Sequence, residues 1–145
     1  MKPLPSMRYN PRMVQPMREE LTRLGFTELL TPDQVDVEVR REDGTLLVVV
    51  NSVCGCAAGR ARPGVALALQ HERKPNRLAT VFAGMEVDAT DRARSYFAPY
   101  PPSSPQIGLF KDGRLVFMLE RKDIEGRPPE EIAQDLVGAF ETHCG

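Results

Sequence analysis

The sequence predicts an α/β fold in which helices and strands alternate along the chain. Three observations carry this prediction. Residues 46–50 form a continuous apolar run, which is typical of a central strand buried on both faces. Apolar residues recur at helical spacing near both ends of the chain, and Asp112-Gly113 separates two short apolar runs, as in a β-hairpin. A chain of 145 residues fits one hydrophobic core, so we expect a single domain over residues 1–145.

The first part of the chain is predicted to hold two helices and a short strand. Residues 1–11 are rich in proline and look irregular, whereas apolar residues at helical spacing over 13–24 predict a helix that ends at Gly25. Residues 26–30 resemble a short strand. An N-cap, a first-turn proline and a capping-box glutamine then predict a helix over 32–41. Alternating valines in that segment also fit a strand, so this alternative stays open.

The part after the central strand is expected to begin with a helix over 57–71. Pro63-Gly64 interrupts this helix, and the proline should introduce a kink. The remaining elements are expected in the order strand 78–83, helix 90–97, proline-rich turn 99–105, hairpin strands 107–110 and 115–119, and helix 130–142.

The charge balance argues against recognition through a broad electrostatic field. The chain has 19 basic and 20 acidic residues and a net charge of −1, which favours neither nucleic acid nor an anionic membrane. The sequence contains neither the apolar stretch of a signal peptide nor a run of membrane-spanning length. We therefore expect a cytoplasmic protein without nucleic-acid or membrane partners. Structural disulfides are uncommon there, so three cysteines indicate redox chemistry or metal binding.

Two of the cysteines form the pair Cys54-Gly55-Cys56, where the predicted central strand ends and a helix begins. The first helical amides and the helix dipole should point toward the sulfur atoms, and Arg60 and Arg62 supply positive charge nearby. Such surroundings lower the pKa of a cysteine, and the thiolate is the nucleophile in disulfide exchange. The pair is therefore a candidate redox-active site.

The order of these features resembles thioredoxin, in which a strand, a cysteine pair and a kinked helix are followed by a Ser-Pro step and a hairpin. The interval of eight residues from Pro105 to Gly113 also matches. The resemblance implies a thioredoxin-like fold: a mixed sheet with helices on both faces, here with an extra N-terminal helix. It further implies a cis peptide bond at Ser104-Pro105, beside the cysteines, where the backbone of Ser104 would face an extended substrate. Val48 stands where thioredoxin has a buried aspartate.

A closer resemblance is to the bacilliredoxin family, and it covers nearly the whole chain. The segments that carry it are Asn51-Ser52-Val53-Cys54-Gly55-Cys56-Ala57-Ala58-Gly59, Ala61-Arg62-Pro63, Tyr9-Asn10-Pro11, Met17-Arg18-Glu19-Glu20-Leu21-Thr22, Tyr100-Pro101-Pro102-Ser103-Ser104-Pro105 and Ile124-Glu125-Gly126-Arg127.

The bacilliredoxin resemblance implies removal of bacillithiol from mixed disulfides on cytoplasmic proteins, together with weak disulfide isomerase activity. Cys54 would be the attacking thiolate and Cys56 the resolving thiol. Bacillithiol would be a thiol co-substrate, and no cofactor or metal is expected to stay bound. Arg60 and Arg62 could bind the carboxylates of this thiol, although arginines on a helix are more often solvated.

Two other functions remain open at this level. A metal or iron-sulfur carrier could use the Cys-Gly-Cys pair, but such scaffolds need a further cysteine upstream, and none precedes Cys54. A non-catalytic binding module of thioredoxin-like fold could use Pro105 to frame a peptide groove. The third cysteine, Cys144, is expected to be a free thiol on the surface near a frayed terminus, with a resolving role as the alternative.

Overall fold

A computed structural model describes residues 9–145, so most of the predicted irregular arm lies outside the described residues. The helices are α1 (Pro11–Thr22), α2 (Pro32–Val39), α3 (Arg62–Ala68), α4 (Val87–Ser95), α5 (Arg121–Ile124) and α6 (Pro129–His143), with a π-helical segment η2 (Ala57–Ala61) before α3. The strands are β1 (Thr27–Glu28), β2 (Thr45–Asn51), β3 (Arg77–Phe82), β4 (Gln106–Lys111) and β5 (Arg114–Leu119).

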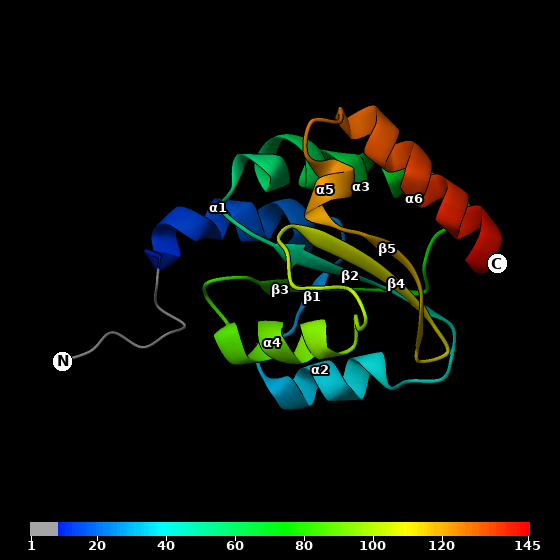
Figure 1. Cartoon of the computed structure of the whole chain (residues 1–145), viewed down its shortest axis with the longest axis horizontal. Coiled ribbons are helices and arrows are strands. Elements are labelled where there is room, and N and C mark those ends of the chain that lie inside the picture. Colours follow the sequence, from blue (N-terminus) through cyan, green and yellow to red (C-terminus); the bar gives the residue numbers. More distant parts are fainter. Residues whose placement is uncertain (1–8) are drawn as a thin grey trace.

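The five strands form one mixed sheet in the order β1-β3-β2-β4-β5 (Figure 1). Strand β2 lies at its centre, pairs parallel with β3 and antiparallel with β4, and is buried over its whole length. Side chains of β2 alternate between two cores: Leu47 and Val49 pack with α1, α3 and α6, whereas Leu46, Val48 and Val50 pack with α2 and α4. Helices therefore cover both faces, and the predicted fold class is confirmed.

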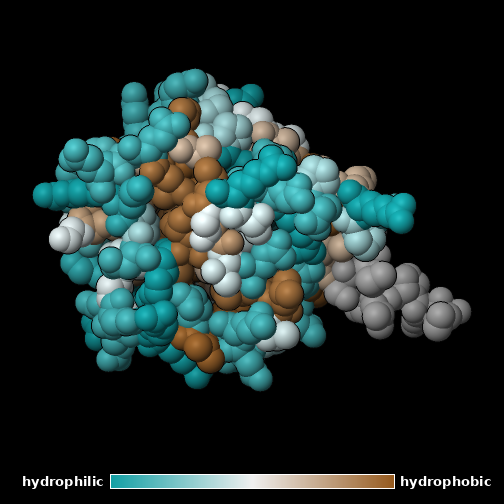
Figure 2. All heavy atoms as spheres, turned by 180° about the vertical axis from the view of Figure 1, so that it is seen from behind, coloured by the Kyte–Doolittle hydropathy of each residue, from teal (hydrophilic) through white to brown (hydrophobic). Residues whose placement is uncertain are grey.

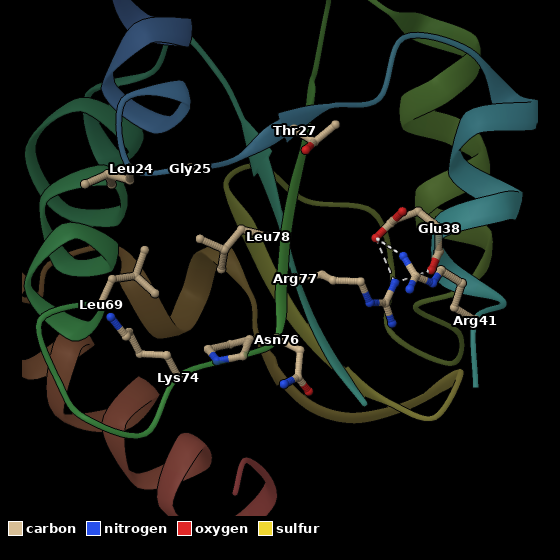
Figure 3. Close-up of a pocket in the computed structure, with 11 residues that line it drawn as sticks. Leu24, Gly25, Thr27, Glu38, Arg41, Leu69, Lys74, Asn76, Arg77 and Leu78 are labelled. Carbon is tan, nitrogen blue, oxygen red and sulfur yellow. Dashed lines mark hydrogen bonds and ion pairs between the residues drawn. The ribbon is translucent and has the colours of Figure 1, made fainter. Parts of the chain in front are cut away.

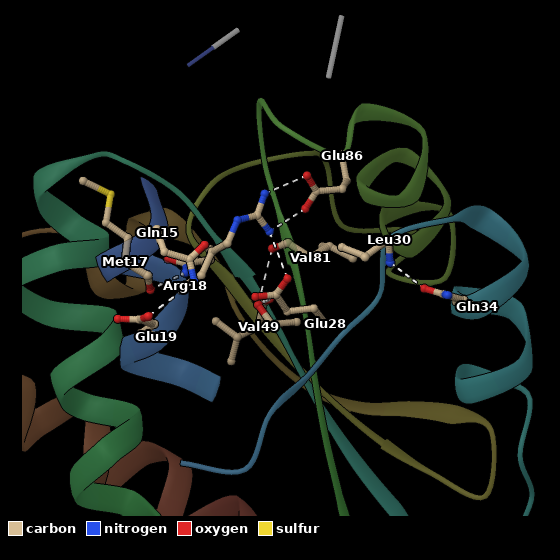
Figure 4. A network of polar contacts seen from close by, with 12 residues as sticks. Gln15, Met17, Arg18, Glu19, Glu28, Leu30, Gln34, Val49, Val81 and Glu86 are labelled. Atoms are coloured by element: carbon tan, nitrogen blue, oxygen red, sulfur yellow. Dashed lines mark hydrogen bonds and ion pairs between the residues drawn. The ribbon is translucent and has the colours of Figure 1, made fainter. Parts of the chain in front are cut away.

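Helix α2 resolves the ambiguity of residues 32–41 in favour of the helix. The Thr31 side chain accepts a hydrogen bond from the backbone N–H of Gln34, and the Gln34 side chain accepts one from Leu30 (Figure 4). Val35 and Val39, four residues apart, are buried on one helical face, while Val37 is 69% exposed. The end cap and helical spacing prevail over the alternation of valines because only one face of this segment meets the core.

The helix after the cysteines is irregular, as expected, but its irregularity precedes Pro63. The π-helical segment η2 runs up to Ala61 and continues directly into α3, so Pro63 lies two residues after the irregular segment. Gly64 lets α3 approach α6 closely, since a Cβ atom there would lie 2.8 Å from Ile132 Cγ2. The helix ends at Ala68, three residues earlier than predicted.

Three further comparisons with the predicted elements concern the second half of the chain. Helix α4 begins at Val87, before the predicted start at residue 90, and the short helix α5 was not predicted. The hairpin is confirmed, because Asp112 and Gly113 adopt φ angles of 51° and 83° in the turn between β4 and β5.

The extra N-terminal helix is tied to the sheet through Arg18 (Figure 4). The Arg18 guanidinium donates two hydrogen bonds to Glu86, at 2.7 and 2.8 Å, and one to Glu28 at 3.2 Å. It also lies over the ring of Phe82, 5.1 Å from the centroid. These contacts hold α1 against β1, the end of β3 and the start of α4, close to where the chain leaves β2 for the cysteines.

The sheet edge formed by β1 and β3 carries the cleft shown in Figure 3, with a volume of about 520 Å3. Strand β1 pairs only with Ala79 and Thr80, which leaves the start of β3 uncovered. No cysteine lines this cleft, so it is separate from the predicted site. The surface on the side opposite to Figure 1 is mostly hydrophilic, with a strip of apolar atoms across it (Figure 2). None of the helices described is long and apolar enough to cross a bilayer.

Candidate active site

Cys54 lies where the chain turns from β2 into a helical segment. Its backbone carbonyl accepts hydrogen bonds from the N–H groups of Ala57 and Ala58, each at 3.1 Å. The Cys54 and Cys56 side chains are partly exposed, and both thiols are free. The strand end and the first helical turn therefore present the pair at the surface, as the sequence predicted.

The surroundings of Cys54 lower the pKa of its thiol. Burial is the largest single influence and raises the pKa, because it penalises the thiolate. This effect is outweighed by the Ser52 hydroxyl, which donates a hydrogen bond to the sulfur at 3.2 Å, by the N–H groups of Ala57 and Cys56, and by the positive charge of Arg121. Cys54 is thus a thiolate over a wider pH range than an ordinary cysteine, as a nucleophile in disulfide exchange requires.

The loop that carries Cys54 rests on a buried polar network centred on Asn51. The Asn51 side-chain oxygen accepts hydrogen bonds from Ser52 N at 2.9 Å and from Arg62 Nη1 at 2.8 Å. Arg62 Nη1 also reaches the carbonyl oxygen of Ser52 at 2.9 Å, and the Asn51 amide donates to the Met17 carbonyl at 3.1 Å. This network holds Ser52 in position to donate to Cys54.

The Ser104-Pro105 peptide bond is cis, which confirms the prediction, and Ala98-Pro99 is cis as well. The carbonyl oxygen of Ser104 lies 3.9 Å from the sulfur of Cys54, although 50 residues separate the two in sequence. Pro105 is buried at the start of β4. The fold therefore brings the Ser-Pro step beside the sulfur of Cys54, with a backbone acceptor facing it.

A shallow pocket of about 270 Å3 opens beside Cys54. Its walls come from five parts of the chain and consist of Tyr9, Ser52, Val53, Cys54, Ala83, Gly84, Arg94 and Ser104. Tyr9 packs closely over Gly84, where a Cβ atom would lie 2.6 Å from the tyrosine ring. Gly84 has a φ of 88°, so both its conformation and this contact favour glycine.

Arg60 and Arg62 are engaged with protein oxygen atoms rather than solvated. Arg60 Nη1 donates to the carbonyl of Arg127 at 2.7 Å. The Arg62 side chain is 2% exposed, and its Nε lies 3.2 Å from a carboxylate oxygen of Glu20. The alternative of solvated arginines is therefore wrong for Arg62, which packs inside the bend between β2 and α3. Neither arginine is among the causes of the lowered pKa of Cys54.

The cation that acts on the cysteines is Arg121, at the start of α5. Its pKa is raised, first by a hydrogen bond to Glu125 and then by the negative charge of Cys56 and Cys54. Its backbone N–H donates to the Ser103 hydroxyl at 3.2 Å, which ties α5 to the Ser-Pro segment. No pattern near the cysteines in sequence could indicate this residue, because it comes from the far side of the hairpin.

Cys144 is not a surface thiol, and this prediction was wrong. It is 4% exposed and packs in the core between the sheet and α6. Burial raises the pKa of Cys144, against smaller opposing effects of a hydrogen bond with Thr45 and of the Lys111 charge. Thr45 begins β2 whereas Cys54 follows its end, so about 20 Å of strand separates the two cysteines. A disulfide requires Cα atoms within about 7 Å, which excludes the resolving role of Cys144 in this fold.

Sequence reasoning missed four residues of the site: Ser52, Tyr9, Arg94 and Arg121. Ser52 and Tyr9 lie in segments that carry the family resemblance, so the sequence marked both residues but did not indicate what either one does. Arg94 and Arg121 are single arginines on distant elements. Within residues 9–145, no three His, Cys, Asp or Glu side chains gather in a way that could hold a metal ion.

Comparison with solved structures agrees with this geometry. The chain is similar to mitochondrial thioredoxin 3 of Saccharomyces cerevisiae, with a TM-score of 0.56 and 15% identity over 81% of this chain and 95% of that one. A thioredoxin of Malassezia sympodialis gives a TM-score of 0.52, with 14% identity over 81% and 90% of the two chains. The fold is therefore a thioredoxin fold. With its free Cys-Gly-Cys pair at the helix start, the chain is a thiol-disulfide oxidoreductase of this fold.

The relatives narrow this class. Residues 9–144 match the family described as "Disulphide isomerase". A bacilliredoxin of Koribacter versatilis is 57% identical, with 92% of each chain covered. A bacilliredoxin of Halalkalibacterium halodurans is 51% identical, with 94% of each covered. The chain belongs to the bacilliredoxin family, and the family resemblance of the sequence is confirmed.

Proposed function

We propose that the protein removes bacillithiol from mixed disulfides on other proteins in the cytoplasm, with Cys54 as nucleophile and Cys56 as resolving thiol. The observation that carries the proposal is the setting of Cys54: a partly exposed sulfur with a lowered pKa, beside a small pocket and the Ser104 carbonyl. The names of the two relatives described above, both bacilliredoxins, support bacillithiol as the thiol.

The proposed reaction has two exchange steps. In the first, the Cys54 thiolate attacks the bacillithiol sulfur, a bond forms between these two sulfurs, and the target cysteine leaves as a thiolate that takes a proton from water. In the second, Cys56, deprotonated, attacks the Cys54 sulfur and releases bacillithiol. The resulting Cys54-Cys56 disulfide needs two electrons from an external thiol reductant before the next cycle.

Ser104 and Pro105 are proposed to dock the substrate. The carbonyl of Ser104 faces Cys54, and Pro105 is buried and holds the turn into β4. A backbone oxygen at this place can accept a hydrogen bond from an extended segment of the target protein. Arg60 and Arg62 are proposed to attract the anionic thiol through their charge alone. Their guanidinium groups are already engaged, because Arg60 donates a hydrogen bond to Arg127 and Arg62 contacts Asn51 and Ser52.

Weak disulfide isomerisation is a second candidate, favoured by the description of the matching family. It would use the same Cys54 thiolate against a disulfide between two cysteines of one protein. The intermediate would be a mixed disulfide between Cys54 and that protein, released when the substrate's own thiol attacks it.

The test uses a purified protein that carries bacillithiol on a single cysteine, incubated with the reduced enzyme and analysed by mass spectrometry. We expect the adduct to leave the target and to be found on Cys54, followed by a Cys54-Cys56 disulfide. The same target carrying glutathione is the matched comparison and should react more slowly. Reduction of insulin disulfides without any loss of bacillithiol from the target would contradict the proposed substrate while leaving the oxidoreductase activity intact.

A further inference from the structure

The pocket beside Cys54 contains a cation that the exchange chemistry does not use. Arg94 lies in the last turn of α4 and forms one wall of the pocket whose other walls include Cys54, Ser104 and Tyr9. Its side chain is half-buried. An attacking sulfur and an arginine therefore open into the same small space.

The guanidinium of Arg94 is held in place by neutral acceptors alone. Its Nη2 donates to the Ser103 carbonyl at 3.0 Å, and its Nε to the Gln106 side-chain oxygen at 3.4 Å. Gln106 is fully buried and is itself fixed by a hydrogen bond to the Pro101 carbonyl at 3.1 Å. Arginine has five N–H donors, and in the described part of the chain these two contacts are the ones that Arg94 makes. Donors remain for a ligand.

Arg94 also lacks a close carboxylate partner among residues 9–145. Burial lowers its pKa, and Asp91 opposes this only as a charge at some distance. Arg92, two residues earlier on the same helix, differs in both respects: it is 43% exposed and pairs with Asp36 at 3.0 Å. A partly desolvated guanidinium without a countercharge gains more from an incoming anion than an exposed, paired one does.

From this arrangement we propose that Arg94 determines substrate specificity by binding a carboxylate of the low-molecular-weight thiol that becomes attached to Cys54. The proposal rests on the proposed function and names the chemical feature of its substrate. A planar guanidinium matches a carboxylate in a two-hydrogen-bond geometry.

The size and position of the pocket favour a small thiol over an acidic side chain of the target protein. Its volume of about 270 Å3 is just below the range of about 300–1,000 Å3 typical for ligand pockets, so it fits a small group. In the proposed first step the target protein leaves and the small thiol stays bonded to Cys54. Arg94, on the pocket wall, therefore acts on the small thiol that stays bonded to Cys54.

The experiment compares two mixed disulfides of one target protein, one with bacillithiol and one with bacillithiol whose carboxylates are esterified. The measured quantity is the ratio of kcat/KM for the acid over the ester, which cancels changes in folding or thiolate reactivity. We expect Arg94→Gln to lower this ratio about tenfold or more, the range for losing a hydrogen bond to a charged group. Arg94→Lys should lower it less, because the charge is kept, and the control Arg92→Gln should leave it unchanged.

Three outcomes would overturn the inference. One is an unchanged ratio in Arg94→Gln, and another is an equal fall in Arg92→Gln. The third is a rate that follows acidic residues near the target cysteine instead of the acid or ester form of the thiol, which would assign the carboxylate to the protein partner. Failure of the proposed function looks different, because the wild-type protein would then reduce insulin but turn over neither bacillithiol adduct.

Discussion

Two cysteines lie at opposite ends of the central strand β2 and have opposite chemistry. Cys54 lies three residues after Asn51, the last residue of the strand, is partly exposed, and has a lowered pKa. Cys144 lies beside Thr45, the first residue of the strand, is buried in the core, and has a raised pKa. Burial opposes the thiolate at both places.

The difference comes from the number of groups that stabilise a negative sulfur. At Cys54 the Ser52 hydroxyl, two backbone N–H groups and Arg121 act together and outweigh the cost of burial. At Cys144 one hydrogen bond with Thr45 and the charge of Lys111 do not. A reactive cysteine is therefore made by its donors, whereas a cysteine without enough of them behaves as a small apolar side chain.

The largest expected effect comes from substituting Cys54 and Cys144 one at a time. Cys54→Ser should abolish removal of bacillithiol, because the attacking thiolate is lost, whereas Cys144→Ala should keep the rate and lower the free energy of unfolding by about 1 kcal/mol for the lost core contacts. Single-turnover rates and urea unfolding measure the two effects.

Cys56→Ser completes this comparison. It should trap bacillithiol on Cys54, because the resolving thiol that would release bacillithiol is lost. Mass spectrometry identifies the modified residue. If Cys54→Ser protein accumulates the adduct on Cys56, the roles of attacking and resolving thiol must be reversed.

A smaller effect is expected from Ser52→Ala. Loss of the hydroxyl donor should raise the pKa of Cys54, so alkylation by iodoacetamide should have its midpoint at higher pH and be roughly two- to tenfold slower at neutral pH. The rate in the wild-type protein should rise with pH through a midpoint below that of an ordinary thiol and then level off. A superimposable pH profile for Ser52→Ala would show that the remaining donors suffice.

The smallest effect is expected from the arginines. Arg121→Gln should slow alkylation of Cys54 by less than about threefold and more at low than at moderate salt, because the charge is exposed and screened. Arg60→Gln, its matched control, should have no effect, since that guanidinium donates to Arg127 and does not contribute to the pKa of Cys54. A larger effect for Arg60→Gln would restore the sequence-based assignment of charge to the helix that follows the cysteines.

Sequence reasoning was most reliable where one short segment carries the whole signal. The apolar run of β2, the cysteines at its end, the Asp-Gly hairpin and the cap of α2 are confirmed by the structure. Each of these features depends on residues within a few positions of one another, so the local backbone preference and the pattern of burial predict the same element. The cis Ser104-Pro105 bond was predicted from the resemblance to thioredoxin and the interval of eight residues to Gly113, because no local rule indicates it.

Residue pattern alone determined that this chain has a thiol pair at a strand end, in an α/β fold. Only the tertiary structure decided which charges and donors surround that pair. Arg62, close in sequence, is buried as a support for Asn51 and Ser52, whereas Arg121 and Arg94 reach the site from α5 and α4. The physical reason is that a side chain's charge acts through space and its burial depends on packing across the sheet. Position along the chain determines neither the distance over which the charge acts nor the burial.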